Sequence, residues 1–182
     1  MKKILAFFTL FLVLAGCSLS EIDNTPTKKV EAFFNNYQTL DQDVLDDLDV
    51  VIAKETNFTT EQKETYRDIL KKHYQNLTYE IKGETVNGNK ATVEVEIEVT
   101  DFYKVMNNSE QDISDNYDDL LGEGSNYDQS KYIDYRLSLL KNAKDTVKYT
   151  LNLTLTKNND GDWVLDDLDD IEEQKILGMY QY

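Results

Sequence analysis

The stretch ATVEVEIEVT, Ala91 to Thr100, alternates apolar and polar side chains over its whole length. Successive side chains of a β-strand point to opposite faces of a sheet, so this pattern predicts a strand with one buried face and one wet face. Such alternation is typical of antiparallel sheets, because strands of parallel sheets are covered on both faces. The same alternation runs from Leu77 to Ile81, and a turn sequence, NGN at 87–89, separates the two runs. Residues 77–100 are therefore predicted to form a β-hairpin.

A second hairpin is predicted toward the C-terminus. Every second residue from Val147 to Leu155 is apolar, and the sequence NNDG at 158–161 is typical of a turn. Trp163 then begins a return strand, which completes the pattern of two antiparallel strands joined by a tight turn.

Apolar residues at helical spacing predict helices before each hairpin. The first helix begins at Thr25-Pro26, since threonine caps a helix and proline suits its first position. Helices at about 44–52 and 59–77 complete the first group, and helices at 109–121 and 128–143, separated by a Gly-rich loop at 122–124, form the second. A short helix is expected at 171–177. Helices grouped before hairpins, rather than alternating with single strands, predict an α+β fold with helices packed on one face of an antiparallel sheet.

The N-terminus has the segments of a targeting signal. Lys2 and Lys3 supply a positive start, and the apolar run from Ile4 to Ala15 follows. This run of twelve residues is too short for a permanent membrane-spanning helix, which needs about 20 residues. We therefore expect the segment to be cleaved.

The four residues LAGC at 14–17 resemble the lipobox of bacterial lipoprotein signal peptides. The resemblance implies a diacylglyceryl group on Cys17, cleavage before this cysteine, and a firm anchor of two acyl chains. The alternative is an ordinary secretory signal with a chance cysteine. We expect a lipoprotein signal peptide at 1–16, a lipidated cysteine and tether at 17–25, and a single extracytoplasmic domain at 26–182. The protein would then be anchored in the cell membrane and face outside the cytoplasm.

Composition limits the partners and the chemistry. Removal of residues 1–16 takes away two lysines and no acidic residue, which changes the net charge from −16 to −18. Phosphate backbones and anionic headgroups repel such a chain, so we expect no nucleic acid partner and no electrostatic docking on membranes. Cys17 is the only cysteine, and its acylation leaves no thiol for disulfides, thiolate metal sites or cysteine catalysis. We expect no cofactor.

The two ends of the predicted domain resemble a known group of proteins. The sequences TPTKKVEAFF at 25–34 and NDGDWVL at 159–165 look like the ends of small cell-surface lipoproteins of Gram-positive bacteria with an NTF2-like or cystatin-like domain. The resemblance spans residues 25–168. It implies a curved sheet wrapped around a long helix, with a concave side as a candidate pocket. The additional helices before and between the hairpins depart from the simplest form of that fold.

His73 is the single imidazole of the chain. Its spacing from Tyr66 and Leu77 places it near the middle of an apolar helix stripe. NTF2-like folds include isomerases and dehydratases, so the resemblance makes His73 a candidate general base. The alternative is a buried histidine satisfied by one hydrogen bond, which we favour because the sequence identifies no orienting partner.

Two further features raise the question of an ion or an anionic ligand. Arg136 has apolar neighbours on the later helix, where it either binds an anion or covers apolar surface with its stem. An EF-hand loop over 156–167 would need an acid or amide where Thr156 stands and a glutamate where Asp167 stands. We therefore interpret Asp160-Gly161 as a turn and expect no metal site.

Twelve tyrosines remain to be explained. Tyrosine is favoured both in α+β cores and at binding surfaces, and Tyr79, Tyr103, Tyr127 and Tyr132 are the candidates for a binding groove. We expect a non-catalytic binding or interaction module whose partner is a surface protein, a peptide or a small ligand. The alternative is an NTF2-like enzyme that uses His73. A pocket holding His73 beside a carboxylate would favour the enzyme, and a filled cone with an exposed tyrosine groove would favour binding.

Overall fold

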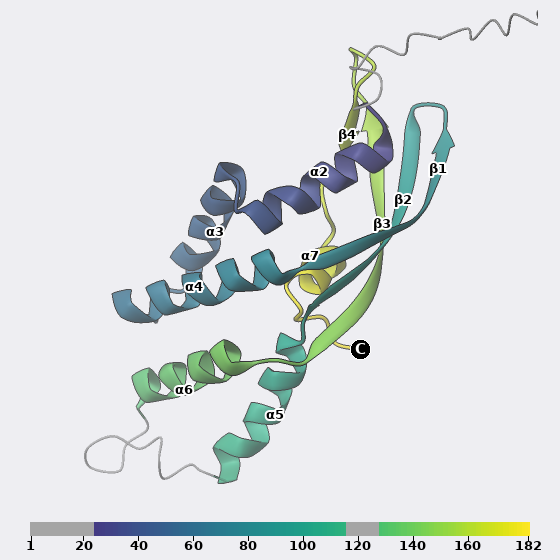
Figure 1. Cartoon of the computed structure of the whole chain (residues 1–182). Coiled ribbons are helices and arrows are strands. Elements are labelled where there is room, and N and C mark those ends of the chain that lie inside the picture. The colour runs from purple at the N-terminus through teal and green to yellow at the C-terminus, as the bar shows by residue number, and fades with distance from the viewer. Residues whose placement is uncertain (1–23, 116–127) are drawn as a thin grey trace, which may run out of the picture.

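The computed structural model describes residues 24–115 and 128–182. These residues form a group of helices followed by two strands, a second group of helices followed by two strands, and a final short helix (Figure 1). In chain order the elements are α2 (Pro26–Thr39), α3 (Gln42–Lys54), α4 (Thr60–Asn76), β1 (Thr78–Asn87), β2 (Lys90–Thr100), α5 (Phe102–Asp115), α6 (Gln129–Asn142), β3 (Thr146–Lys157), β4 (Trp163–Leu165) and α7 (Asp170–Ile176).

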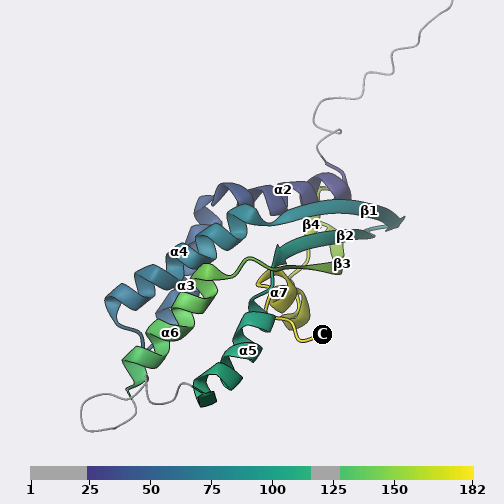
Figure 2. The same cartoon turned by 60° about the horizontal axis from the view of Figure 1, so that its bottom comes forward.

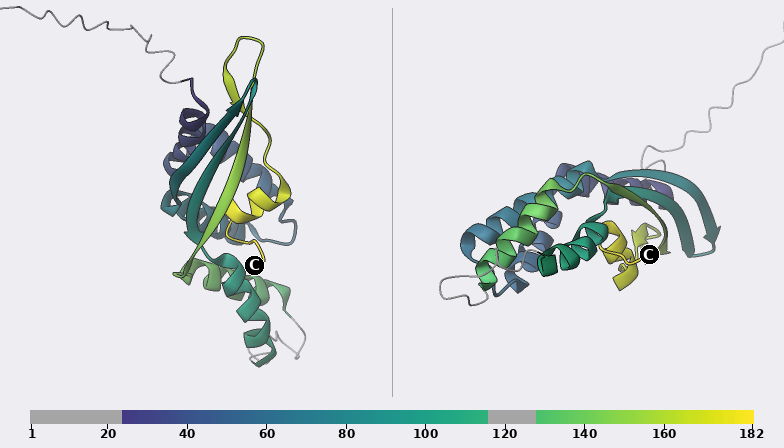
Figure 3. Two further views of the ribbon diagram at one scale, coloured as in Figure 1. Left: turned by 90° about the vertical axis from the view of Figure 1, so that its right-hand side faces the viewer. Right: turned by 90° about the horizontal axis from the view of Figure 1, so that it is seen from below.

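The four strands form one antiparallel sheet in the order β1-β2-β3-β4. Val93 lies opposite Leu153 and Val95 opposite Leu151, and all four side chains are at most 1% exposed. The polar residues between them, such as Glu94, lie on the other face. Figure 3 shows the long, curved strands on one side and α2, α3 and α4 on the other. The predicted α+β class, with helices on one face of a curved antiparallel sheet, is confirmed.

Helix α2 covers the inner face of the sheet. Its predicted start is confirmed, because the Thr25 side chain accepts a hydrogen bond from the Lys28 amide and Pro26 stands in the first turn. Val30 and Phe34 are fully buried in the core between helix and sheet. Burial of such side chains stabilises the fold by about 1.5–3 kcal/mol each. The inner face that the family resemblance made a candidate pocket is therefore filled at this position.

A second apolar cluster lies beyond the end of the sheet. Helices α3, α4, α5 and α6 extend past the strands and pack on one another there (Figure 2). Gln62 joins two of these helices, since its buried amide nitrogen donates to the Asp134 carboxylate at 2.8 Å and to the Ser130 hydroxyl at 3.1 Å. The buried members of this cluster are Leu48, Ile52, Ile69, Leu70, Phe102, Ile133, Leu137 and Leu140.

Helix α5 begins at Phe102, whereas the sequence predicted a start at Ser109. Asp101 explains the earlier start, because its buried carboxylate accepts a hydrogen bond from the Lys104 amide at 2.9 Å and so satisfies a free donor of the first turn. The rest of the predicted helix, 116–121, and the Gly-rich loop at 122–124 lie outside the described residues.

The C-terminal segment closes the junction between β2 and α5. The Gly178 carbonyl accepts a hydrogen bond from the Tyr103 amide at 2.8 Å. The Tyr182 hydroxyl donates to the Asp101 carboxylate at 2.8 Å. Gly178 adopts a φ of +67°, and a Cβ at this position would overlap the carbonyl oxygen of Thr100.

The beginning of the described chain lies at the other end of the sheet. The Asn24 side chain accepts a hydrogen bond from the Trp163 amide at 2.9 Å, and Trp163 pairs with Lys157. Lys157 in turn donates its amide to the carbonyl of Asn89, next to the turn that begins β2. Asn24 and Thr100 therefore mark opposite ends of the sheet. No helix within the described ranges is long and apolar enough to cross a membrane.

Candidate functional site: the pocket at His73

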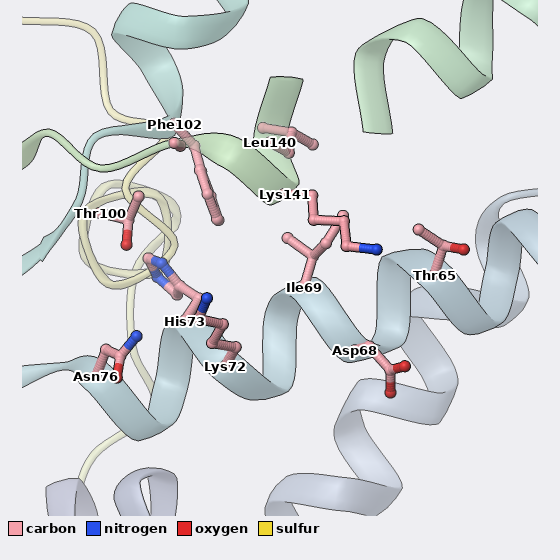
Figure 4. A pocket seen from close by; sticks show the side chains of 11 residues that line it. Thr65, Asp68, Ile69, Lys72, His73, Asn76, Thr100, Phe102, Leu140 and Lys141 are labelled. Carbon is pink, nitrogen blue, oxygen red and sulfur yellow. The ribbon is translucent and has the colours of Figure 1, made fainter. Parts of the chain in front are cut away.

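His73 lies in the last turn of α4 and is 2% exposed. Its ring lines a pocket of about 220 Å³ between α4, the end of α6 and the junction of β2 with α5. Figure 4 shows the imidazole beside Thr100 and below the ring of Phe102. The residues around the pocket are Thr65, Asp68, Ile69, Lys72, His73, Asn76, Thr100, Phe102, Leu140, Lys141 and Ala143.

The hydrogen bond of His73 fixes its tautomer. Its Nε2 lies 2.8 Å from the carbonyl oxygen of Ile176, which can only accept, so Nε2 carries the hydrogen. In the neutral ring Nδ1 then holds a free lone pair. This nitrogen is buried and has no hydrogen-bond partner among the residues that the structure describes. Stacking against Phe102, with ring centroids 4.7 Å apart, holds the imidazole in this orientation.

Burial controls the protonation of this imidazole. Loss of solvent lowers the pKa of His73 from 6.5 to about 4, and the hydrogen bond to Ile176 opposes this change only in part. The ring is therefore neutral at pH 7 and offers Nδ1 as an acceptor. A general base works best with a pKa near the operating pH, and here the orienting group is a backbone carbonyl rather than a carboxylate. The geometry supports hydrogen bonding to a ligand better than proton abstraction.

This pKa predicts a pH-dependent stability. The folded pKa of about 4 lies below the ordinary value of 6.5, so between these pH values the unfolded chain binds a proton that the folded protein does not. Stability due to His73 is thus fully present above pH 6.5 and is lost as the pH falls to 4, by about 3 kcal/mol. Urea unfolding of the wild type and of His73→Gln between pH 7 and 4 should show the difference between the two proteins shrinking by this amount.

Subtraction of the His73→Gln curve removes the contribution of the many carboxylates, which titrate in both proteins. An independent measurement uses the proton resonance of the single imidazole, which should titrate in the folded protein with a midpoint near pH 4. Parallel stability curves together with a midpoint near 6.5 would contradict the burial of an unprotonated ring.

Two charged side chains of the pocket come from different helices. Lys72 belongs to α4 and Lys141 to α6, both are exposed, and neither takes part in an ion pair within the described residues. In Figure 4, Lys141 reaches toward α4 near Ile69, and Asp68 lies on the other side of the α4 ribbon. The pocket therefore combines an apolar wall, one buried acceptor, two cations and the carboxylate of Asp68.

The other sequence candidates lie elsewhere. Tyr79 stands on β1, where its ring stacks on Phe34 and its hydroxyl donates to the Asn35 side chain at 3.2 Å. Tyr103, Tyr132 and Arg136 meet at a separate hollow of about 180 Å³, and the Arg136 guanidinium lies 5.5 Å from the centre of the Tyr132 ring. Tyr127 lies outside the described residues. The structure thus distributes the candidates over three places and gathers only Tyr103, Tyr132 and Arg136.

Larger hollows lack the feature that distinguishes the His73 pocket. One of about 310 Å³ between α2, α3, α4 and α7 is lined mainly by apolar side chains, with Tyr37 and Tyr74 at its wall. Burial raises the pKa of Tyr37 to about 12. Another hollow, of about 440 Å³, lies between α4 and α6 next to the His73 pocket and shares Thr65 and Lys141 with it. Among the described side chains, only His73 has a buried polar atom without a hydrogen-bond partner.

The described residues also bear on the acidic segments. The turn at 158–161 is confirmed, because the Asn158 side chain accepts hydrogen bonds from the amides of Asp160 and Asp162 and Gly161 adopts a φ of +87°. Within residues 24–109 and 128–182, whose side chains the structure describes, no three His, Cys, Asp or Glu side chains form a group that could hold a metal ion.

Comparison with known proteins decides one point at the N-terminus. Residues 1–18 match the family model of the prokaryotic membrane lipoprotein lipid attachment site. The chain carries a lipoprotein attachment site. This supports a lipid-anchored membrane lipoprotein, in agreement with the lipobox resemblance at 14–17.

One solved structure is similar over most of the chain. The crystal structure of YcdA from Bacillus subtilis subsp. subtilis strain 168, described as a candidate lipoprotein, is similar with a TM-score of 0.45 and 14% sequence identity. The alignment covers 89% of this chain and 54% of YcdA, so the chain spans about half the length of that protein. No curated protein matches the sequence.

Proposed function

We propose that this lipoprotein is anchored through Cys17, faces outside the cytoplasm, and binds a small ligand in the pocket at His73 without converting it. One observation carries the binding role, namely a pocket lined by a buried histidine whose Nδ1 has no hydrogen-bond partner in the described chain. An unsatisfied polar atom of this kind costs about 1–3 kcal/mol, and a ligand that donates a hydrogen bond removes the cost.

The small volume of the pocket favours a small ligand over a surface protein or peptide as the partner of this site. A pocket of about 220 Å³ bounded by three elements suits a compact molecule. We also propose that the domain is NTF2-like or cystatin-like. The position of α2 against a curved antiparallel sheet supports this assignment. The rival, an NTF2-like enzyme with His73 as general base, has the presence of His73 in the pocket in its favour.

The single histidine allows a direct test of the binding role. The full-length lipoprotein, labelled with ¹⁵N-histidine and purified in detergent, gives one Nδ1 resonance. We expect this resonance to shift with at least one member of a panel of monosaccharides, hydroxybenzoates, hydroxybenzamides, hydroxy acids and sugar phosphates. The shift should disappear in Ala143→Phe, which fills the pocket, and should persist in the matched control Ala32→Phe, which changes an exposed alanine of α2.

The same samples separate binding from catalysis. If the protein is a binder, mass spectrometry should recover each bound compound unchanged after incubation. Conversion of a panel member by the wild type, lost in His73→Gln, would support the enzyme instead. A panel without any effect on the Nδ1 resonance would contradict a ligand site at His73.

A further inference from the structure

The chemistry of the His73 pocket restricts the ligand further than its size does. At neutral pH the ring is unprotonated and Nε2 is occupied by the carbonyl of Ile176, so Nδ1 is the ring nitrogen left to accept a hydrogen bond from a ligand. A ligand atom that meets Nδ1 must therefore be an O–H or N–H donor. An ether oxygen or a carboxylate oxygen at this position would leave two acceptors facing each other.

The walls near the imidazole are apolar. Ile69 and Phe102 are at most 6% exposed, and Leu140, at 7%, completes this side of the pocket. A hydrocarbon or ring portion of the ligand can bury apolar surface against these side chains. The part of the ligand that carries the donor should therefore be attached to an apolar body.

The mouth of the pocket, unlike its apolar walls, carries charged side chains. Lys72 and Lys141 approach from α4 and α6, and neither is held by a carboxylate in the described residues. Asp68 contributes one negative charge on the other side of the α4 ribbon (Figure 4). In a chain with 35 acidic and 19 basic residues, two unpaired ammonium groups at one opening are suited to an anion.

From these three features we propose that the ligand is a small organic acid: a carboxylate or phosphate bound by Lys72 and Lys141, an apolar body against Phe102, and an O–H or N–H group donating to Nδ1 of His73. This inference rests on the proposed ligand-binding function of the pocket. Both lysines also stand in or near the last turns of their helices. A cation there stabilises the helix, because the C-terminal end carries a partial negative charge. A purely structural role of that kind predicts altered stability with unaltered binding.

The experiment compares three forms of each probe on the labelled full-length protein. Each hydroxybenzoate is tested beside its O-methyl ether, which lacks the donor, and its amide, which lacks the charge. Sugar phosphates and the parent sugars form a second series that distinguishes phosphate from carboxylate recognition. We expect at least one acid to shift the Nδ1 resonance, with the ether and the neutral form binding at least tenfold more weakly.

Matched substitutions test the role of the lysines. Lys72→Gln and Lys141→Gln should each weaken binding of the acid by up to about fivefold, the upper end of the range for one exposed ion pair. Lys144→Gln makes the same change of charge at an exposed residue outside the pocket lining and should change the affinity less than twofold.

The outcomes separate this inference from the function on which it rests. Neutral forms that bind as tightly as the acids would overturn the proposal that the ligand is an acid, and so would lysine variants that change only the melting temperature. Either result would leave a ligand site at His73. A panel in which no acid and no neutral compound shifts the Nδ1 resonance would overturn both.

Discussion

Replacing Gly178 with alanine should lower the free energy of unfolding by more than about 4 kcal/mol, which is exceptional for one methyl group. The added Cβ would overlap the carbonyl oxygen of Thr100 and lie 3.2 Å from its carbonyl carbon. Thr100 is the last residue of β2. It pairs with Thr146 of β3, and the next amide, that of Asp101, donates to the carbonyl of Asp145 at 2.9 Å, so the backbone here has little freedom to move. The φ of +67° adds a further cost for any residue with a side chain.

Gly88 provides the matched control for this prediction. It has a similar φ of +62°, but a Cβ there would have no neighbour within 4 Å. Gly88→Ala should therefore cost only the conformational part, about 1–2 kcal/mol. Urea unfolding of both variants measures the difference. Equal losses would show that the C-terminal segment moves away from Thr100 without penalty, and would contradict the tight closure of the β2–α5 junction.

Replacing Cys17 with alanine should abolish the mature, membrane-anchored form of the protein. Without the thiol no thioether forms, and the two acyl chains that give firm anchoring are lost. The variant should accumulate as unprocessed precursor or be released into the medium. Fractionation of cells, combined with incorporation of a labelled fatty acid, measures the outcome.

Ser18→Ala is the control for the Cys17 substitution, because it alters the next residue and keeps the attachment atom. This control should be processed, labelled and retained like the wild type. A Cys17→Ala protein that is cleaved normally and still retained in the membrane would contradict anchoring through this cysteine.

Local patterns in the sequence predicted most of the elements. The alternation from Ala91 to Thr100 depends only on the period of a strand, and β2 buries the expected residues. The start of α2 was predictable because its cap and first-turn proline are neighbours in the chain. The start of α5 was missed although the sequence carries its signals. Phe102, Val105 and Met106 stand at helical spacing, and Asp101 directly after a strand is a recognisable cap.

The site was less accessible from sequence because it is assembled across the chain. Helical spacing indicated that His73 faces apolar neighbours, and it is buried in α4. Its hydrogen-bond acceptor, Ile176, is 103 residues away, and no local pattern identifies such a partner. Leu140 and Lys141 reach the pocket only because α6 packs beside α4. Sequence reasoning missed Lys72 and Lys141, and the one available signal was their position near the ends of two predicted helices.

The placement of Asn24 and Thr100 at opposite ends of the sheet gives the molecule a direction. If Cys17 carries the anchor, the chain arrives from the membrane side at Asn24, beside Trp163. The pocket at Thr100 then lies a full strand away, and the 11 residues of β2 extend for about 35 Å. If the anchored domain stands on that end of the sheet, the strands would hold the proposed ligand site clear of the lipid headgroups, and a ligand would then enter from the surrounding medium rather than from the bilayer.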